Sequence, residues 1–236
     1  MLPVMLMAVG LGLLLSGCDR EAEPPAAVAP VAAPVATTPT HSETPAPLED
    51  GGDSRVMVYH CGPEMRLVAE FKGDGMWLFL PEQTLQLQQV VTASGARFEA
   101  DGVLFWNKGN NALLEIDGQP QPQCVAEPRE AVWEKAKLAG ADFRALGQEP
   151  GWVLELYPER VVLLLDYGQT RIEAPSVTPI NDGASSRFDL EAEGQPLTIT
   201  LKGESCTDSM SGELFETRVL VEYGERLFSG CGRPLH

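Results

Sequence analysis

Alternating runs of apolar and polar residues, separated by Asp-Gly dipeptides, constrain the fold of this chain most. Between Arg55 and Gln123 short runs with a period of two are typical of β-strands with one buried face, and one run is continuously apolar. The runs are Val56–Tyr59, Leu67–Phe71, the continuously apolar Met76–Leu80, Leu85–Gln88, Val103–Trp106 and Ala112–Ile116. Asp-Gly is a strong hairpin signal because both residues tolerate positive φ. Three such pairs lie between the runs: Asp74-Gly75, Asp101-Gly102 and Asp117-Gly118. The pattern predicts a small antiparallel β-barrel or curled sheet.

A different pattern follows this region. Residues from Glu127 to Ala139 favour a helix, with Pro128 suited to the first turn and Gly140 to the stop. Further strand-like runs come next: Trp152–Tyr157, Val161–Leu165, Gln169–Glu173, Arg187–Leu190, Leu197–Leu201 and Leu214–Tyr223. We therefore expect a mainly β protein, with a small antiparallel β-barrel at 55–126, a short connecting helix at 127–140 and a second β-rich domain at 141–236.

The first residues have the pattern of a bacterial lipoprotein signal peptide. An apolar stretch from Leu2 to Leu15, too short to span a bilayer, leads into Ser16, Gly17 and Cys18. This predicts cleavage after residue 17 and acylation of Cys18, with more than one acyl chain, palmitate among them, holding the protein stably on a membrane. Residues 18–54 are rich in Ala and Pro and poor in large apolar residues, which predicts a disordered tether.

These features place the mature protein in the envelope of a Gram-negative bacterium, facing the periplasm. Asp19 would keep a lipoprotein in the inner membrane under the enterobacterial sorting rule, but that rule varies between bacteria. The sequence therefore leaves inner and outer membrane open. An ordinary cleaved secretory peptide with an incidental cysteine is the alternative.

Four cysteines remain if Cys18 carries lipid. An even number in an exported chain indicates disulfides, and their positions divide into Cys61 with Cys124 and Cys206 with Cys231. Other pairings would join distant segments, and the sequence does not exclude them.

The net charge of −17 disfavours nucleic acid and anionic lipid as partners, and it favours a cationic one. On charge alone, simple solubility is the better explanation.

No catalytic or metal site is evident. The three histidines are His41 in the tether, His60 next to Cys61, and His236 at the last position, so no triad forms. Ser94 lacks the first glycine of a nucleophile elbow, and no histidines or cysteines have metal-ligand spacing. We expect a protein that is not an enzyme and that has no cofactor. An envelope hydrolase is the least favoured of the possible functions.

Two motifs between the first cysteine pair carry a specific resemblance. They are Val90–Phe98, with Ser94 and Gly95 at its centre, and Phe105–Ala112, with Lys108 and Gly109. Together with Tyr59-His60-Cys61 and Cys124, they resemble the family of membrane-bound inhibitors of c-type lysozyme over residues 59–124. Phe98 stands where the family commonly has Tyr. We expect Phe98 and Trp106 to pack in the core or at its edge.

The resemblance implies a partner and a mechanism. In these inhibitors a loop serine and a loop lysine enter the lysozyme cleft, and the matching positions are Ser94 and Lys108. The expected function is therefore inhibition of a c-type lysozyme, which protects peptidoglycan. The alternative is a non-catalytic envelope binding or structural module, with a diverged inhibitor domain and its main role in residues 141–236.

The second β-rich region resembles segments of bacterial envelope lipoproteins. The segments concerned are Gln148–Trp152 and Cys206–Gly212. The resemblance does not supply a role or a partner. Glu149 and Asp208 are possible site residues, but turn chemistry explains both, and we favour that explanation.

Overall fold

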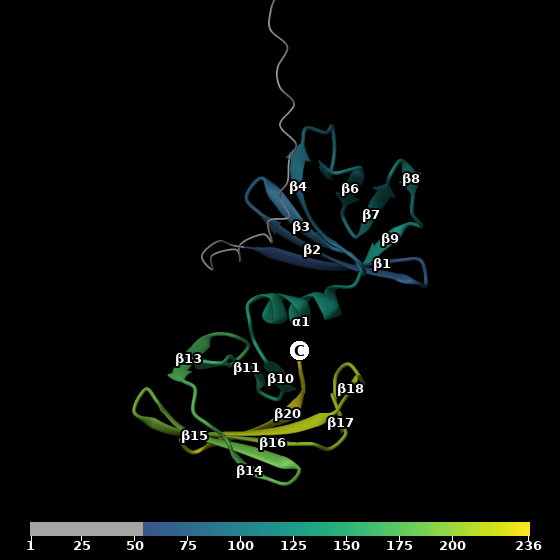
Figure 1. Ribbon diagram of the computed structural model, residues 1–236. Helices are drawn as coiled ribbons and strands as arrows, with labels where there is room; N and C mark the ends of the chain where they lie inside the picture. The colour runs from purple at the N-terminus through teal and green to yellow at the C-terminus, as the bar shows by residue number, and fades with distance from the viewer. Residues whose placement is uncertain (1–53) are drawn as a thin grey trace, which may run out of the picture. The chain divides into compact units, whose positions relative to one another are not determined.

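The computed structural model describes residues 54–236, which contain two extended β-sheets, a short β-ribbon and one helix (Figure 1). The predicted signal peptide, the predicted lipid-attachment residue Cys18 and nearly all of the predicted tether lie outside the described residues. Among the described residues, no helix has the length and apolar character needed to cross a bilayer.

The first sheet has nine strands in antiparallel order. They are β1 (Arg55–Cys61), β2 (Met65–Lys72), β3 (Gly75–Phe79), β4 (Thr84–Val90), β5 (Ala96–Ala100), β6 (Val103–Lys108), β7 (Asn111–Ile116), β8 (Gln119–Pro120) and β9 (Cys124–Ala126).

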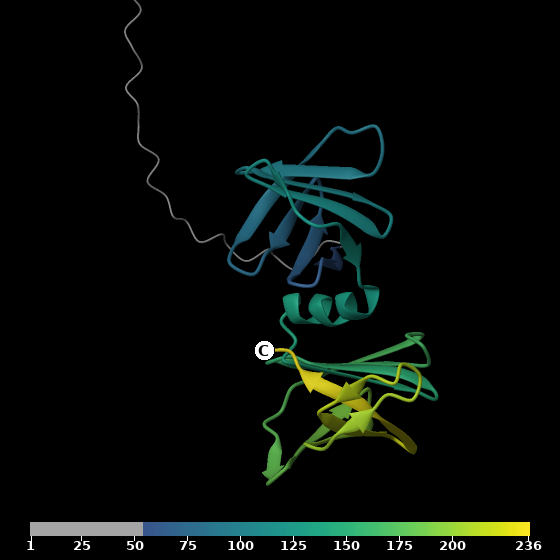
Figure 2. The same ribbon diagram turned by 90° about the vertical axis from the view of Figure 1, so that its right-hand side faces the viewer.

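Eight of these strands close into a barrel, as the sequence predicts. Strands β1 to β6 pair in chain order, β6 pairs with β7, and β9 closes the ring by pairing with both β7 and β1. Figure 2 shows these strands curling around a common interior. Tyr59 and Phe105 are fully buried there, with ring centroids 5.4 Å apart, and burial raises the pKa of the Tyr59 phenol.

Two of the three predicted Asp-Gly turns form as expected. Asp101 and Asp117 have positive φ angles of 48° and 51°, and each begins a two-residue turn between paired strands. The third turn is displaced by one residue. Lys72 pairs with Gly75, so the turn consists of Gly73 and Asp74 because Gly73 supplies the positive φ of 57°.

The predicted helix is α1 (Pro128–Leu138). Pro128 lies in its first turn, where a missing N–H costs nothing, and the Glu127 side chain accepts a hydrogen bond from the Arg129 backbone N–H at 3.2 Å. Ala131 packs with Val56, Val58 and Val68 of β1 and β2. The helix therefore buries apolar surface against the barrel wall.

The second extended sheet also has nine antiparallel strands, but its strand order is open. In chain order they are β10 (Phe143–Gln148), β11 (Gly151–Leu156), β12 (Arg160–Leu165), β13 (Thr170–Pro175), β14 (Ile180–Asp182), β15 (Ser185–Ala192), β16 (Gln195–Lys202), β19 (Thr217–Tyr223) and β20 (Arg226–Pro234). Its curved inner face buries an apolar core that includes Leu154, Leu163 and Ile199. This half-barrel confirms the expected second β-rich region, and with it the mainly β fold class.

The predicted strand Leu214–Tyr223 is divided in two. Leu214 and Phe215 form β18, which pairs with β17 (Cys206–Thr207) in a separate ribbon, and β19 begins at Thr217. Phe215 turns inward to stack on Trp133 of α1, with ring centroids 5.2 Å apart. The break therefore lets Phe215 and β19 pack on different surfaces.

Candidate functional site

Ser94 lies in the loop between β4 and β5, with its side chain exposed. Its backbone oxygen accepts a hydrogen bond from Trp106 Nε1–H at 2.9 Å, and Thr92 Oγ1 lies 3.4 Å from the same oxygen. The loop is therefore attached to β6 through an indole, so Ser94 projects from a fixed backbone.

Lys108 ends β6 at the hairpin to β7, and it is also exposed. Lys108 pairs with Asn111 across a two-residue turn in which Gly109 has a φ of +60°. Among the described residues Lys108 makes no ion pair, so its ammonium is free to meet a carboxylate of another molecule.

The structure brings Ser94 and Lys108 to the same end of the barrel. Ala96 pairs with Asn107, so Ser94 lies two residues before this pair and Lys108 one residue after it. Gly95 has a φ of +71°, and a Cβ at this position would lie 2.3 Å from the Asn107 carbonyl oxygen. The Ser94 loop therefore packs directly on the backbone that leads into Lys108, an approach that only glycine permits.

The short strand β9 supports the Lys108 hairpin. The Ala126 backbone N–H donates to the Asn110 oxygen at 2.8 Å, and Gln123 Nε2 donates to Asn111 Oδ1 at 2.9 Å. A disulfide between Cys124 and Cys61 fixes β9 to β1. The hairpin is thus held from the barrel seam as well as from its own strands.

The two aromatic residues of the motifs differ in position. Phe98 is 4 % exposed and packs against Phe71, with ring centroids 5.4 Å apart, as expected for a core residue. For Trp106 the core alternative is wrong, because its side chain lies on the outer face with 37 % exposed; its indole N–H bonds the Ser94 loop, so only packing at the edge remains. Neither the Trp106 hydrogen bond to Ser94 nor this exposure was predicted, although its spacing of two from Lys108 indicates the same outward side of one strand.

Cys61 is in a disulfide, so the neighbouring His60 has no free thiol to activate. His60 Nε2 instead lies 2.7 Å from Glu130 Oε1 on α1, and Arg66 Nε donates to the other oxygen of that carboxylate at 2.7 Å. Burial raises the pKa of the Glu130 carboxyl, but these hydrogen bonds outweigh it, so its pKa lies below the ordinary value. These three residues attach α1 to the barrel.

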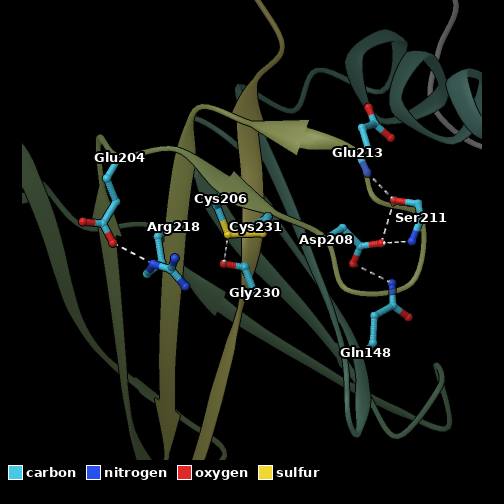
Figure 3. The surroundings of a disulfide bond; sticks show 9 residues. All are labelled: Gln148, Glu204, Cys206, Asp208, Ser211, Glu213, Arg218, Gly230 and Cys231. Atoms are coloured by element: carbon cyan, nitrogen blue, oxygen red, sulfur yellow. Dashed lines mark hydrogen bonds and ion pairs between the residues drawn. A yellow bond between two sulfur atoms is a disulfide. The ribbon is translucent and has the colours of Figure 1, made fainter.

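The second disulfide joins Cys206 to Cys231, beside a loop that contains Asp208 (Figure 3). Asp208 is only 6 % exposed and accepts hydrogen bonds from Gln148 Nε2 at 3.1 Å and from the Ser211 backbone N–H and hydroxyl, each at 2.7 Å. Burial raises the pKa of Asp208, but these hydrogen bonds outweigh it and lower the pKa. All of these donors come from the same sheet and loop, which gives Asp208 a structural role.

Glu149 lies in the exposed turn between β10 and β11, since Gln148 pairs with Gly151. No metal-binding group of three or more His, Cys, Asp or Glu occurs within residues 54–236.

The geometry defines a class: a disulfide-closed antiparallel barrel that presents an exposed serine and an exposed lysine on adjacent, supported loops. Residues 59–123 match the family described as membrane-bound lysozyme-inhibitor of c-type lysozyme. A curated relative, the membrane-bound lysozyme inhibitor of C-type lysozyme of Yersinia enterocolitica serotype O:8 / biotype 1B, is 38 % identical over 60 residues.

That alignment covers 25 % of this chain and 51 % of the relative, so the chain spans about half the length of the curated relative it matches. No solved structure matches the chain. The family match concerns the first barrel, which contains Ser94 and Lys108; α1 and the second extended sheet lie beyond it.

Proposed function

We propose that this chain is a lipid-anchored envelope protein whose first barrel inhibits a c-type lysozyme and so protects peptidoglycan. The observation that carries the proposal is the family match at residues 59–123, together with the position of Ser94 and Lys108 side by side at one exposed end of the barrel. The acidic balance of the chain adds electrostatic attraction for a cationic enzyme.

The chemistry of the enzyme explains why a lysine would inhibit it. A c-type lysozyme cleaves its glycan with two carboxyl groups that flank the bond, one of which must stay protonated to act as the acid. An ammonium inserted between them occupies the place of the sugar. It also favours the ionised form of the acid, because an opposite charge at close range lowers the pKa of a carboxyl.

Ser94 has a complementary role in this proposal. Its hydroxyl can donate a hydrogen bond to the second carboxylate, while its backbone oxygen remains bonded to Trp106. Because the backbones of both loops are already held in place, little backbone conformational entropy is lost on binding. The proposed inhibitor is not an enzyme and needs no cofactor.

Lysis of peptidoglycan by hen egg-white lysozyme tests the proposal, with the soluble chain 19–236, which retains every described residue. Lys108→Met keeps the length of the side chain and removes its charge, and it should weaken inhibition by about 2 to 5 kcal/mol. Ser94→Ala should weaken it less, by about 0.5 to 1.5 kcal/mol for one hydrogen bond.

Matched controls are Lys202→Met and Ser209→Ala, two exposed residues outside the barrel, which should leave inhibition unchanged. Failure of the correctly oxidised wild-type chain to inhibit at micromolar excess would refute the proposal. It would favour instead a binding or structural module whose main role lies in residues 141–236.

The anchor is tested separately in a Gram-negative host. Metabolic labelling with palmitate should mark the full chain, and Cys18→Ala should abolish both the label and membrane fractionation. Labelling that survives Cys18→Ala would contradict this part of the proposal.

A further inference from the structure

The outer face of the barrel next to Lys108 is unusually apolar. Trp106 on β6, Leu113 on β7 and Val125 on β9 are 37 %, 42 % and 50 % exposed. Their chain neighbours Phe105 and Leu114 point inward and are fully buried. The outward positions of an antiparallel barrel wall normally carry polar residues, so these three need an explanation of their own.

The strand register makes these residues one patch. Trp106 is directly opposite Leu113, and Asn111 lies opposite both Lys108 and Val125. Opposed side chains on one face have Cβ atoms about 4.5 to 5.5 Å apart, and diagonal neighbours such as Leu113 and Val125 about 7 to 8 Å. The apolar patch, defined as Trp106, Leu113 and Val125, therefore borders Lys108 directly.

We propose that this apolar patch is part of the lysozyme-binding surface and packs on the lip of the cleft that receives Lys108. The inference rests on the proposed function and extends it from two loop residues to the outer face of β6, β7 and β9. Continuity with Lys108 and Ser94 carries it, because Trp106 belongs to the patch and also holds the Ser94 loop through its indole N–H.

Interface physics supports this assignment. A stable protein complex buries about 800 Å² on each partner, which is more than two loop residues supply. A charged residue at the centre of an interface also contributes most when surrounding contacts exclude water from it. Asn111 lies directly opposite Lys108, while Trp106, two residues before Lys108, and Leu113, diagonal to it, provide that exclusion on one side. Charged residues at these two positions would keep the ammonium hydrated.

The test is the variant Leu113→Thr/Val125→Thr in the soluble chain 19–236. Threonine keeps a high strand propensity, and both side chains are exposed, so the barrel should retain its far-UV spectrum and its urea midpoint. The dissociation constant for hen egg-white lysozyme should rise at least about ten-fold, mainly through faster dissociation. Val125→Thr alone, a nearly isosteric change, should give part of this effect.

Two comparisons complete the experiment. Leu227→Thr, at a leucine on β20 that is even more exposed (66 %), should leave the dissociation constant unchanged. Lys108→Met, measured in parallel, reports on the proposed function itself.

If Lys108→Met weakens binding while Leu113→Thr/Val125→Thr does not, the inference is overturned and the proposed function stands. If the wild-type chain does not bind lysozyme, both are overturned. If the double variant instead converts a dimer into a monomer in sedimentation and leaves inhibition intact, the patch joins two copies of the chain, and the inference is also overturned.

Discussion

Replacing Gly95 with alanine should separate the Ser94 loop from the barrel. The added Cβ would lie 2.3 Å from the Asn107 carbonyl oxygen and 3.0 Å from Trp106 Nε1. A carbon–oxygen contact normally needs about 3.3 Å or more, so the loop has to move by about 1 Å. That movement would break the hydrogen bond that fixes the Ser94 backbone.

Gly109→Ala is the matched control, because Gly109 also has a positive φ, of +60°, but a Cβ there would meet no atom within 4 Å. Both variants have the cost of a left-handed alanine, about 1 to 3 kcal/mol. Gly95→Ala adds overpacking against a rigid backbone, about 1 to 3 kcal/mol more. We therefore expect a loss of unfolding free energy of about 2 to 6 kcal/mol for Gly95→Ala, against about 1 to 3 kcal/mol for Gly109→Ala.

Urea unfolding, followed by far-UV circular dichroism, measures both values in the same buffer. The inhibition assay should show a larger loss for Gly95→Ala as well, since the displaced loop carries Ser94. If Gly95→Ala destabilises the chain no more than Gly109→Ala, the Ser94 loop does not pack on Asn107 and the reasoning is wrong.

Three further predictions follow from the contacts of the described residues. Removing the first disulfide with Cys61→Ala/Cys124→Ala should lower the unfolding free energy by about 4 kcal/mol, because it closes a sequence separation of 63 residues. Removing the second with Cys206→Ala/Cys231→Ala should lower it by about 3.5 kcal/mol, because the separation is 25 residues. The reverse order in urea unfolding would contradict this prediction. Asp208→Asn should cost about 1 to 3 kcal/mol at pH 7. The folded-state pKa of Asp208 lies below its unfolded value, so its contribution to stability is present above about pH 4 and is lost as the pH falls through the folded pKa. Urea unfolding at pH 3 should therefore show a smaller difference in unfolding free energy between the wild-type chain and Asp208→Asn than at pH 7. An equal difference at both pH values would contradict this prediction. Trp106→Phe keeps an aromatic ring but removes the N–H that donates to the Ser94 backbone oxygen. Inhibition should therefore weaken by about 0.5 to 1.5 kcal/mol while the fold is retained. An unchanged inhibition constant would show that this hydrogen bond does not position Ser94.

The sequence predicts the parts of the fold that depend on neighbouring residues. The turns at Asp101 and Asp117 form as expected because positive φ is a property of those dipeptides themselves. Helix α1 is likewise marked by Pro128 near its start and Gly140 just beyond its end.

The sequence does not reveal strands whose formation depends on packing between residues far apart in the chain. Strand β5 buries only Phe98 among exposed or half-buried neighbours, so its alternation is weak. Strands β10 and β20 contain Gly147 and Gly230, which normally weaken a strand, but here both glycines leave space for the indole of Trp152. No local pattern reveals that requirement.

The sequence likewise predicts some features of the candidate site and not others. Ser94 and Lys108 follow from short motifs, and their proximity follows from the pairing of two consecutive strands. The outward position of Trp106 follows from its spacing of two from Lys108 on one strand, but its bond to the Ser94 backbone depends on the loop folding back, which sequence spacing does not determine.

The ring closes through its shortest strand, and this sets the conditions under which the barrel can work. Strand β9 is only three residues long, and one of them, Cys124, supplies the sulfur that ties β9 to β1. In a reducing compartment such as the cytosol, the seam would lose its covalent link, and β9 would support the turn that bears Lys108 less firmly. A reduced chain would thus stay more pliable, and it would acquire a rigid binding end only once these two thiols are oxidised.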